Sequence, residues 1–222
     1  MPQIITSKVV RGVEVFYRPN STDEKIIKEV IERRIYIKPT RGFSVLPGET
    51  WLDLGANIGA FAAYCRSCGA VAHCYEPEPK CFQVLKKNTN YHGFQCFQEA
   101  VSTSSDSYLE FYKNENVKGR FSPAKVYSRG SLLAWVKRNG EKILVKNKNI
   151  KEITQSYDGI KMDIEGAEAQ ILDAGYLPPC KKLVLEYHTT RDKSAERLKK
   201  RIEWLRSRFS EVVYNEAYFG KM

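Results

Sequence analysis

The stretch WLDLGANIGAF, residues 51–61, combines a short apolar run, an acid and two glycines four residues apart. The apolar run is typical of a short buried strand, and the residues after the second glycine are typical of a helix. Gly55 and Gly59 lie in the turn between these elements, where the absence of side chains lets backbone approach a ligand closely. Asp53, at the carboxyl end of the strand, is placed to accept a hydrogen bond from that ligand.

Segments with strand patterns and segments with helix patterns alternate on both sides of this turn. Such alternation predicts an α/β fold in which helices cover both faces of a parallel sheet. The predicted strands are residues 12–19, 49–55, 70–79, 94–102, 157–166, 181–188 and 211–219, and the predicted helices are residues 21–36, 60–69, 80–93, 167–175 and 191–209.

The length of 222 residues suits one large domain. We expect residues 1–48 to form a strand and helix arm of the same domain as residues 49–222, with a polar, basic insert at about residues 102–157. The N-terminus lacks the apolar stretch of a signal peptide, and no apolar run reaches eighteen residues. These features predict a cytoplasmic protein without a transmembrane segment.

The chain is basic, with 36 Lys and Arg against 26 Asp and Glu and a formal net charge of +10. Such an excess favours a polyanionic partner, for example nucleic acid or a phosphorylated donor. Basic residues gather at 113–151 and again in the helix at 191–209. The apolar residues of that helix recur every three or four positions, so we interpret its basic side as a solvated face of an amphipathic helix.

A second motif, CYEPEP at residues 74–79, ends the strand that follows the glycine turn. An acid at this place in α/β folds holds the two hydroxyls of a ribose, and Glu76 occupies it. The glycine pattern is D-x-G-x-x-x-G, whereas a pyrophosphate site prefers G-x-G-x-x-G. The two motifs together predict a nucleoside ligand without a pyrophosphate.

These motifs resemble those of class I S-adenosylmethionine-dependent methyltransferases, with DLGANIGAF as the first and YEPEP as the second. A third stretch, YDGIKMDIEGAEAQIL at residues 157–172, is similar to the K-x-D-x-E-G-x-E signature of the FkbM-type methyltransferases. The resemblance spans about residues 26–190. It implies a Rossmann-like three-layer sandwich, with a mostly parallel seven-stranded sheet whose last strand is antiparallel. It also implies S-adenosylmethionine as the cofactor and methyl transfer to a hydroxyl, often on a sugar.

The resemblance further implies which residues surround the cofactor. Glu76 would hold the ribose, and Gln98 or Glu99 would meet the adenine. The methionine part and the transferred methyl group would lie near Asp53, Gly55, Asn57, Gly59 and Asp163.

Methyl transfer to a hydroxyl needs an aligned acceptor oxygen and a group that removes its proton. On a strand, Lys161, Asp163 and Glu165 share one face at the carboxyl end of the sheet. Asp163 is the leading candidate for the base or for a group near the methyl. For Glu165, stabilisation of the positive end of the following helix is an equally good explanation.

The next strand ends in Glu186 and His188, which share one face and are expected beside Asp163 and Glu165. His188 has the titration range of a general base. Alternatively, Asp163, Glu165 and Glu186 could hold a divalent cation, Mg²⁺ or Mn²⁺, that lowers the pKa of the acceptor hydroxyl.

Two other functions stay open at this point. A nucleic-acid methyltransferase acting on RNA would lay the basic segment 113–151 along phosphates. A non-catalytic module would keep the fold and only bind a partner. We favour a sugar or glycan acceptor, because the basic residues are scattered among acids and form no clean stripe.

Overall fold

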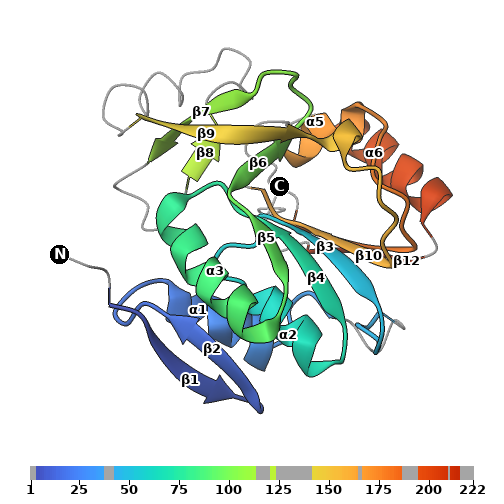
Figure 1. The fold of residues 1–222 in the computed structure, drawn as a ribbon. Coiled ribbons are helices and arrows are strands. Elements are labelled where there is room, and N and C mark those ends of the chain that lie inside the picture. Colours follow the sequence, from blue (N-terminus) through green and yellow to red (C-terminus); the bar gives the residue numbers. More distant parts are fainter. Residues whose placement is uncertain are drawn as a thin grey trace.

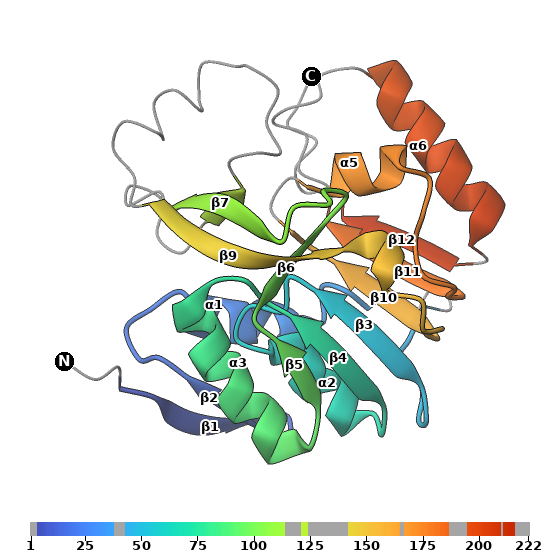
Figure 2. The same cartoon turned by 45° about the horizontal axis from the view of Figure 1, so that its top comes forward.

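The structure is a computed structural model, and it describes residues 4–37, 43–113, 121–123, 142–164, 167–186, 195–209 and 211–215. At its centre is a six-stranded sheet in the order β12-β11-β10-β3-β4-β5, in which every neighbouring pair is parallel (Figures 1 and 2). The strands are β3 (Thr50–Leu54), β4 (Val71–Tyr75), β5 (Gln95–Phe97), β10 (Gly159–Met162), β11 (Lys182–Glu186) and β12 (Glu211–Asn215).

This parallel sheet confirms the predicted α/β class, with helices on both faces (Figure 1). One face carries the N-terminal helices together with α2 and α3, and the other carries α5 and α6. In the described part of the chain this sheet has six strands and not the predicted seven, because the predicted first strand at 12–19 lies outside it. The predicted last strand, at 211–219, is present as β12, but the prediction that it is antiparallel is wrong, since it pairs parallel to β11. The helices of the main domain are α2 (Ala60–Ser67), α3 (Pro79–His92), α5 (Glu168–Asp173) and α6 (Ala195–Arg208).

The central strands are buried on both faces, because successive side chains point into two different hydrophobic clusters. Along β3, Trp51 packs into the cluster below α2 and α3, whereas Leu52 and Leu54 pack into the cluster below α5 and α6. Trp51 has room only because a glycine faces it: a Cβ on Gly159 would lie 2.6 Å from the indole ring.

The N-terminal arm packs against α2 and α3. Asn88 of α3 ties the two parts together, because its amide donates to the carbonyls of Phe16 at 3.0 Å and Ile58 at 2.7 Å and accepts from the Phe16 N–H at 2.8 Å. The predicted first strand, at 12–19, is the second strand of an antiparallel hairpin, and the strand before it was not predicted. The arm consists of β1 (Thr6–Val10), β2 (Val13–Tyr17), α1 (Asp23–Ile27) and the π-helical turn η1 (Lys28–Glu32).

The predicted strand at 94–102 is two strands that belong to different sheets. Its first half is β5 of the central sheet, and its second half, β6, pairs with β9 in a four-stranded sheet of order β6-β9-β7-β8. Figure 2 shows this second sheet above the carboxyl ends of β3 and β4. The second sheet consists of β6 (Glu99–Ser102), β7 (Tyr108–Lys113), β8 (Phe121–Pro123) and β9 (Lys142–Asn149), with a 3-10 turn η3 (Ile150–Glu152) after it.

No helix in the described part of the chain has the length and apolar character that a bilayer-spanning helix requires. Most of the basic segment 113–151 lies outside the described residues.

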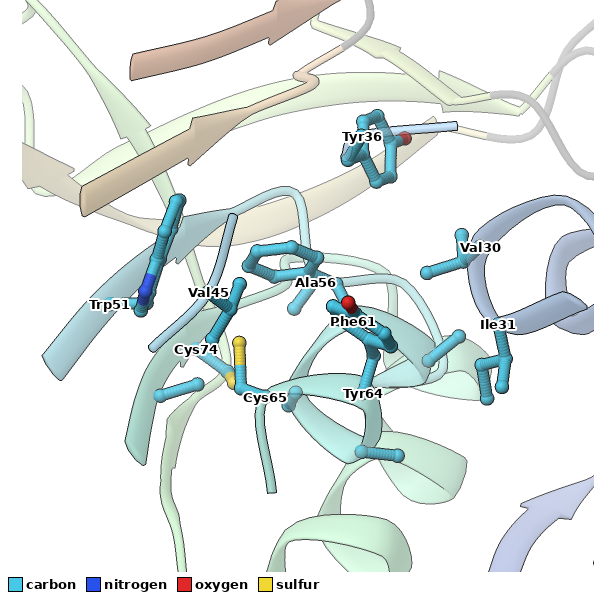
Figure 3. Packing of buried hydrophobic residues seen from close by; sticks show 14 of the residues in the cluster. Val30, Ile31, Tyr36, Val45, Trp51, Ala56, Phe61, Tyr64, Cys65 and Cys74 are labelled. Carbon is cyan, nitrogen blue, oxygen red and sulfur yellow. The ribbon is translucent and has the colours of Figure 1, made fainter. Parts of the chain in front are cut away.

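A row of aromatic rings lies between β3 and the arm (Figure 3). Phe61 of α2 is at its centre and meets Trp51 edge-on at 5.4 Å and Tyr36 edge-on at 5.9 Å between ring centroids. Tyr64 lies 6.5 Å from Phe61 in the same row. Packing of this kind holds the arm residue Tyr36 in a defined position at the edge of the sheet.

Candidate functional site

The glycine turn after β3 has left-handed backbone at three positions: φ is +77° at Gly55, +52° at Asn57 and +84° at Gly59. A Cβ on Gly55 would lie 1.8 Å from the carbonyl oxygen of Asp163, and one on Gly59 would lie 2.8 Å from Leu85 Cδ1. The packing of the protein is thus a reason for a glycine at position 55 besides the predicted approach of a ligand, because the backbone of Asp163 leaves no room for a side chain there. At Gly59 the crowding comes from the end of the Leu85 side chain.

We expect Gly55→Ala to lower the free energy of unfolding by about 2 to 5 kcal/mol, through left-handed strain and overpacking. Gly93→Ala is the matched control, because Gly93 has a φ of +75° but a Cβ added there would meet nothing within 4 Å. The control should lose only about 1 to 2 kcal/mol. Equilibrium urea unfolding measures both. If both variants lose the same free energy of unfolding, the close approach of the Asp163 carbonyl to residue 55 does not destabilise Gly55→Ala.

A pocket opens at the carboxyl ends of β3, β4 and β10, and residues of β6 and β7 complete it. Five of the predicted cofactor residues line it: Gly55, Asn57, Glu76, Glu99 and Asp163. Its apolar wall, which comes from the second sheet and the loop after β10, was not predicted from the sequence. That wall includes Ala100, Val101, Leu109, Phe111 and Ile164.

Three other predicted cofactor residues lie away from the pocket lining. Gln98 is exposed between β5 and β6, so of the two adenine candidates Glu99 is the one at the pocket. Gly59 precedes α2 and packs against α3. Asp53 is 0% exposed and lies beneath the turn, so the expectation that it accepts a hydrogen bond from the ligand is wrong in this structure.

Asp53 instead forms a buried ion pair with Lys161. The parallel register of β3 and β10 places the two residues opposite each other, and Lys161 Nζ lies 3.1 Å from Asp53 Oδ1. Lys161 also donates to the Gly55 carbonyl at 2.6 Å. Burial opposes the lysine charge, but the carboxylates of Asp53 and Asp163 raise the pKa of Lys161. The signature lysine is therefore a charged support beneath the glycine turn.

Glu76 forms the floor of the pocket at the end of β4. Its two carboxyl oxygens accept from the N–H groups of Asn57 and Glu78, each at 2.8 Å. Burial raises the pKa of Glu76 to about 7, although both backbone donors oppose this. Each oxygen keeps a lone pair for a ligand, and nearby Asn57 Oδ1 is buried with no hydrogen-bond partner among the described residues.

Asp163 and Glu186 lie close together at the ends of β10 and β11, which are neighbouring strands, as the sequence led us to expect. The hydroxyl of Tyr36 donates to Asp163 Oδ2 at 2.9 Å and lies 3.4 Å from Glu186 Oε2. Tyr36 comes from the N-terminal arm and was not among the predicted site residues, although the stretch EVIERRIY at 29–36, which it ends, lies within the span of the family resemblance. The other two catalytic candidates, Glu165 and His188, lie outside the described residues.

The predicted metal trio includes Glu165, so its geometry also falls outside the described part of the chain. Elsewhere among the described residues, no group of three or more His, Cys, Asp or Glu side chains is arranged to hold a metal ion.

Residues 53–212 match the methyltransferase FkbM domain. The chain belongs to the FkbM methyltransferase family. A curated FkbM relative, the 31-O-demethyl-FK506 methyltransferase FkbM of Streptomyces tacrolimicus, is 26% identical over 140 residues, which are 61% of this chain and 53% of that protein. The chain thus spans about half the length of the curated relative that it matches.

A solved structure shows the same fold. The S-adenosylmethionine-dependent methyltransferase from Agrobacterium tumefaciens superposes with a TM-score of 0.50 at 14% identity, over 96% of this chain and 61% of that one. Membership of the FkbM family confirms the prediction of an S-adenosylmethionine-dependent methyltransferase domain with a Rossmann-like fold.

Proposed function

We propose that this FkbM domain transfers the methyl group of S-adenosylmethionine to a hydroxyl group, and that the acceptor is a sugar or glycan. The observation that carries the proposal is the position of Asp163. This carboxylate lines the pocket. A second carboxylate, Glu186, lies near it, and the Tyr36 hydroxyl contacts both. A hydroxyl acceptor needs such a proton acceptor next to it. The name of the Streptomyces relative also places its methyl group on an oxygen.

The lining of the pocket fits S-adenosylmethionine, whose bound form supplies a methyl carbon on a sulfonium that is open to in-line attack. Ribose hydroxyls and an ammonium group are donors, and the floor of the pocket offers the acceptor oxygens of Glu76 and Asn57. A flat adenine needs apolar contacts, and Leu109 and Phe111 supply them from β7.

Asp163 acts on the acceptor. As the acceptor oxygen gains the methyl group, its hydroxyl proton passes to the Asp163 carboxylate and leaves to solvent with the product. Lys161 holds the glycine turn in place beneath this carboxylate and keeps a positive charge close to the acids. Positioning and proton removal are the contributions of this chain's own residues.

Pairing of charges on the described surface supports a sugar acceptor over nucleic acid. On α6, Lys200 lies 3.0 Å from Glu196, and Lys199 lies 3.9 Å from Glu203. Lys148 of β9 lies 2.8 Å from Glu152 of the following turn η3. A polyanion would have to compete with these acids, so these three lysines, on the described part of the surface, do not offer an open phosphate-binding stripe.

Incubation with methyl-labelled S-adenosylmethionine and separate pools of glycans, nucleotide sugars and RNA tests this proposal. We expect label in a carbohydrate hydroxyl, with a rate that changes little between 50 and 200 mM salt. Label in RNA alone, with affinity that falls by about 10³ over that salt range, would establish the nucleic-acid function instead. If neither S-adenosylmethionine nor S-adenosylhomocysteine raises the melting temperature, the proposed cofactor is wrong.

Glu76 gives the cofactor site a pH dependence. Ribose hydroxyls donate to the ionised carboxyl, so binding lowers the raised pKa of Glu76 and releases a proton. Affinity for S-adenosylhomocysteine should therefore rise by about tenfold from pH 6 to pH 8, as the free carboxyl titrates near 7. Glu76→Gln should flatten this dependence and weaken binding at pH 8 by about 1.5 to 3 kcal/mol. Calorimetry at both pH values measures this, and equal slopes for the two proteins would contradict the ribose assignment.

A further inference from the structure

The N-terminal arm places one polar group among the acids at the carboxyl edge of the sheet, the hydroxyl of Tyr36. It lies 2.9 Å from Asp163 Oδ2 and 3.4 Å from Glu186 Oε2, so it bridges the ends of two neighbouring strands. We propose that Tyr36 is a positioning residue that links Asp163 and Glu186 into one proton-accepting unit. The catalytic part of this inference rests on the proposed methyl transfer, whereas the linkage of the two acids does not.

Two acceptors compete for one hydrogen at this hydroxyl. A phenol has one hydrogen to donate, and here two carboxyl groups face it. The shorter contact assigns that hydrogen to Asp163. When Asp163 takes a proton from the acceptor, it no longer needs the donor and can itself donate to the phenol oxygen. The phenol hydrogen then rotates toward Glu186, which stays charged, so one proton enters and no other covalent bond changes.

The surroundings of Tyr36 suit a fixed, neutral donor. Its ring stands edge-on to Phe61 at 5.9 Å, and the Lys161 ammonium lies 5.4 Å from the ring centroid (Figure 3 shows Tyr36 and Phe61). Burial, with Asp163, Glu186 and Asp53 nearby, raises the pKa of Tyr36 well above its usual value. The phenol therefore keeps its hydrogen at neutral pH. Among the described residues, the charged groups near it are these three acids and Lys161.

Tyr36→Phe tests the proposal, since it keeps the ring contacts and removes only the hydroxyl. We expect kcat to fall by about 10- to 100-fold, the range seen when a group that orients a reacting residue is lost. Affinity for S-adenosylhomocysteine should stay within about twofold, because Tyr36 does not line the pocket. The acidic limb of the kcat profile should move to higher pH, because a carboxylate that loses a donor is harder to ionise.

Tyr64→Phe is the matched control. Tyr64 also packs on Phe61, and its hydroxyl interacts with Cys68, away from the acids. This variant should keep the wild-type kcat and pH profile. Equal changes in the two variants, or a Tyr36→Phe protein with an unchanged kcat and acidic limb, would overturn the proposal.

A measurement without cofactor or acceptor separates this inference from the proposed function. In a ¹³C carboxyl titration by NMR, the Asp163 signal is assigned by its loss in Asp163→Asn. We expect its midpoint to rise in Tyr36→Phe and to fall in Glu186→Gln, since a like charge has been removed. If Tyr36→Phe fails to fold, the Asp163 midpoint in Glu186→Gln still tests the linkage. Midpoints that do not move would overturn the linkage, whereas wild-type protein that transfers no methyl group while the midpoints move would refute only the proposed function.

Discussion

Asp163→Asn is expected to lower methyl-transfer turnover by about 10² to 10⁴, the usual contribution of a positioned proton acceptor. Asparagine keeps the size of the side chain and an oxygen for the Tyr36 hydroxyl, but it takes up no proton at neutral pH. The backbone of residue 163 still donates to the Leu54 carbonyl at 3.0 Å, so the end of β10 should keep its place. Affinity for S-adenosylhomocysteine should therefore stay within a few-fold.

Steady-state kinetics and calorimetry on the same preparations measure this prediction. Asp158→Asn is the matched control, because Asp158 lies just before β10, at the opposite end of that strand, and accepts from the Thr50 N–H at 3.0 Å. Asparagine preserves that acceptor, so turnover should be unchanged. If the turnover of Asp163→Asn stays within a few-fold of wild type, Asp163 is not the base. Glu186 and His188, which lies outside the described residues, would then be the candidates.

Lys161→Met is expected to lower the free energy of unfolding by about 3 to 5 kcal/mol, because it breaks a buried ion pair from one side. Methionine fills a similar volume but leaves Asp53, which is fully buried and whose pKa burial already raises, without its counter-charge. Apart from Lys161, the two carboxyl oxygens of Asp53 have no hydrogen-bond donor among the described residues. The Gly55 carbonyl loses its donor as well.

Urea unfolding measures this loss. The control is Lys181→Met, since Lys181 forms an ion pair at 3.8 Å with Asp158 in which the lysine side chain is 79% exposed. Such a surface pair should contribute less than about 1 kcal/mol. Adding Asp53→Asn to Lys161→Met should recover part of the loss, because the uncompensated charge is then gone. A double variant as unstable as Lys161→Met would show that the charge of Asp53 does not cause the loss.

Local pattern was enough to predict the parallel character of the central sheet and the edge at which the pocket opens. Strand and helix patterns can each be recognised in a short stretch of sequence. Their alternation along the chain therefore predicted the parallel sheet. Because strands of a parallel sheet end at one edge, their terminal residues meet there, and Glu76 and Asp163 both line the observed pocket. Reliance on local pattern also explains the error at 94–102. A continuous strand pattern does not indicate that its two halves pair in different sheets.

The sequence by itself determined the fold class, the family and the edge of the sheet that carries the site, because each depends on residues close together in the chain. Only the tertiary structure decided which atoms make Gly55 necessary, that Asp53 pairs with Lys161, and that Tyr36 reaches Asp163. Those contacts join residues about a hundred or more positions apart, and they depend on strand register and on how the arm packs against α2. Register and packing are set by the whole core at once, so no short motif records them.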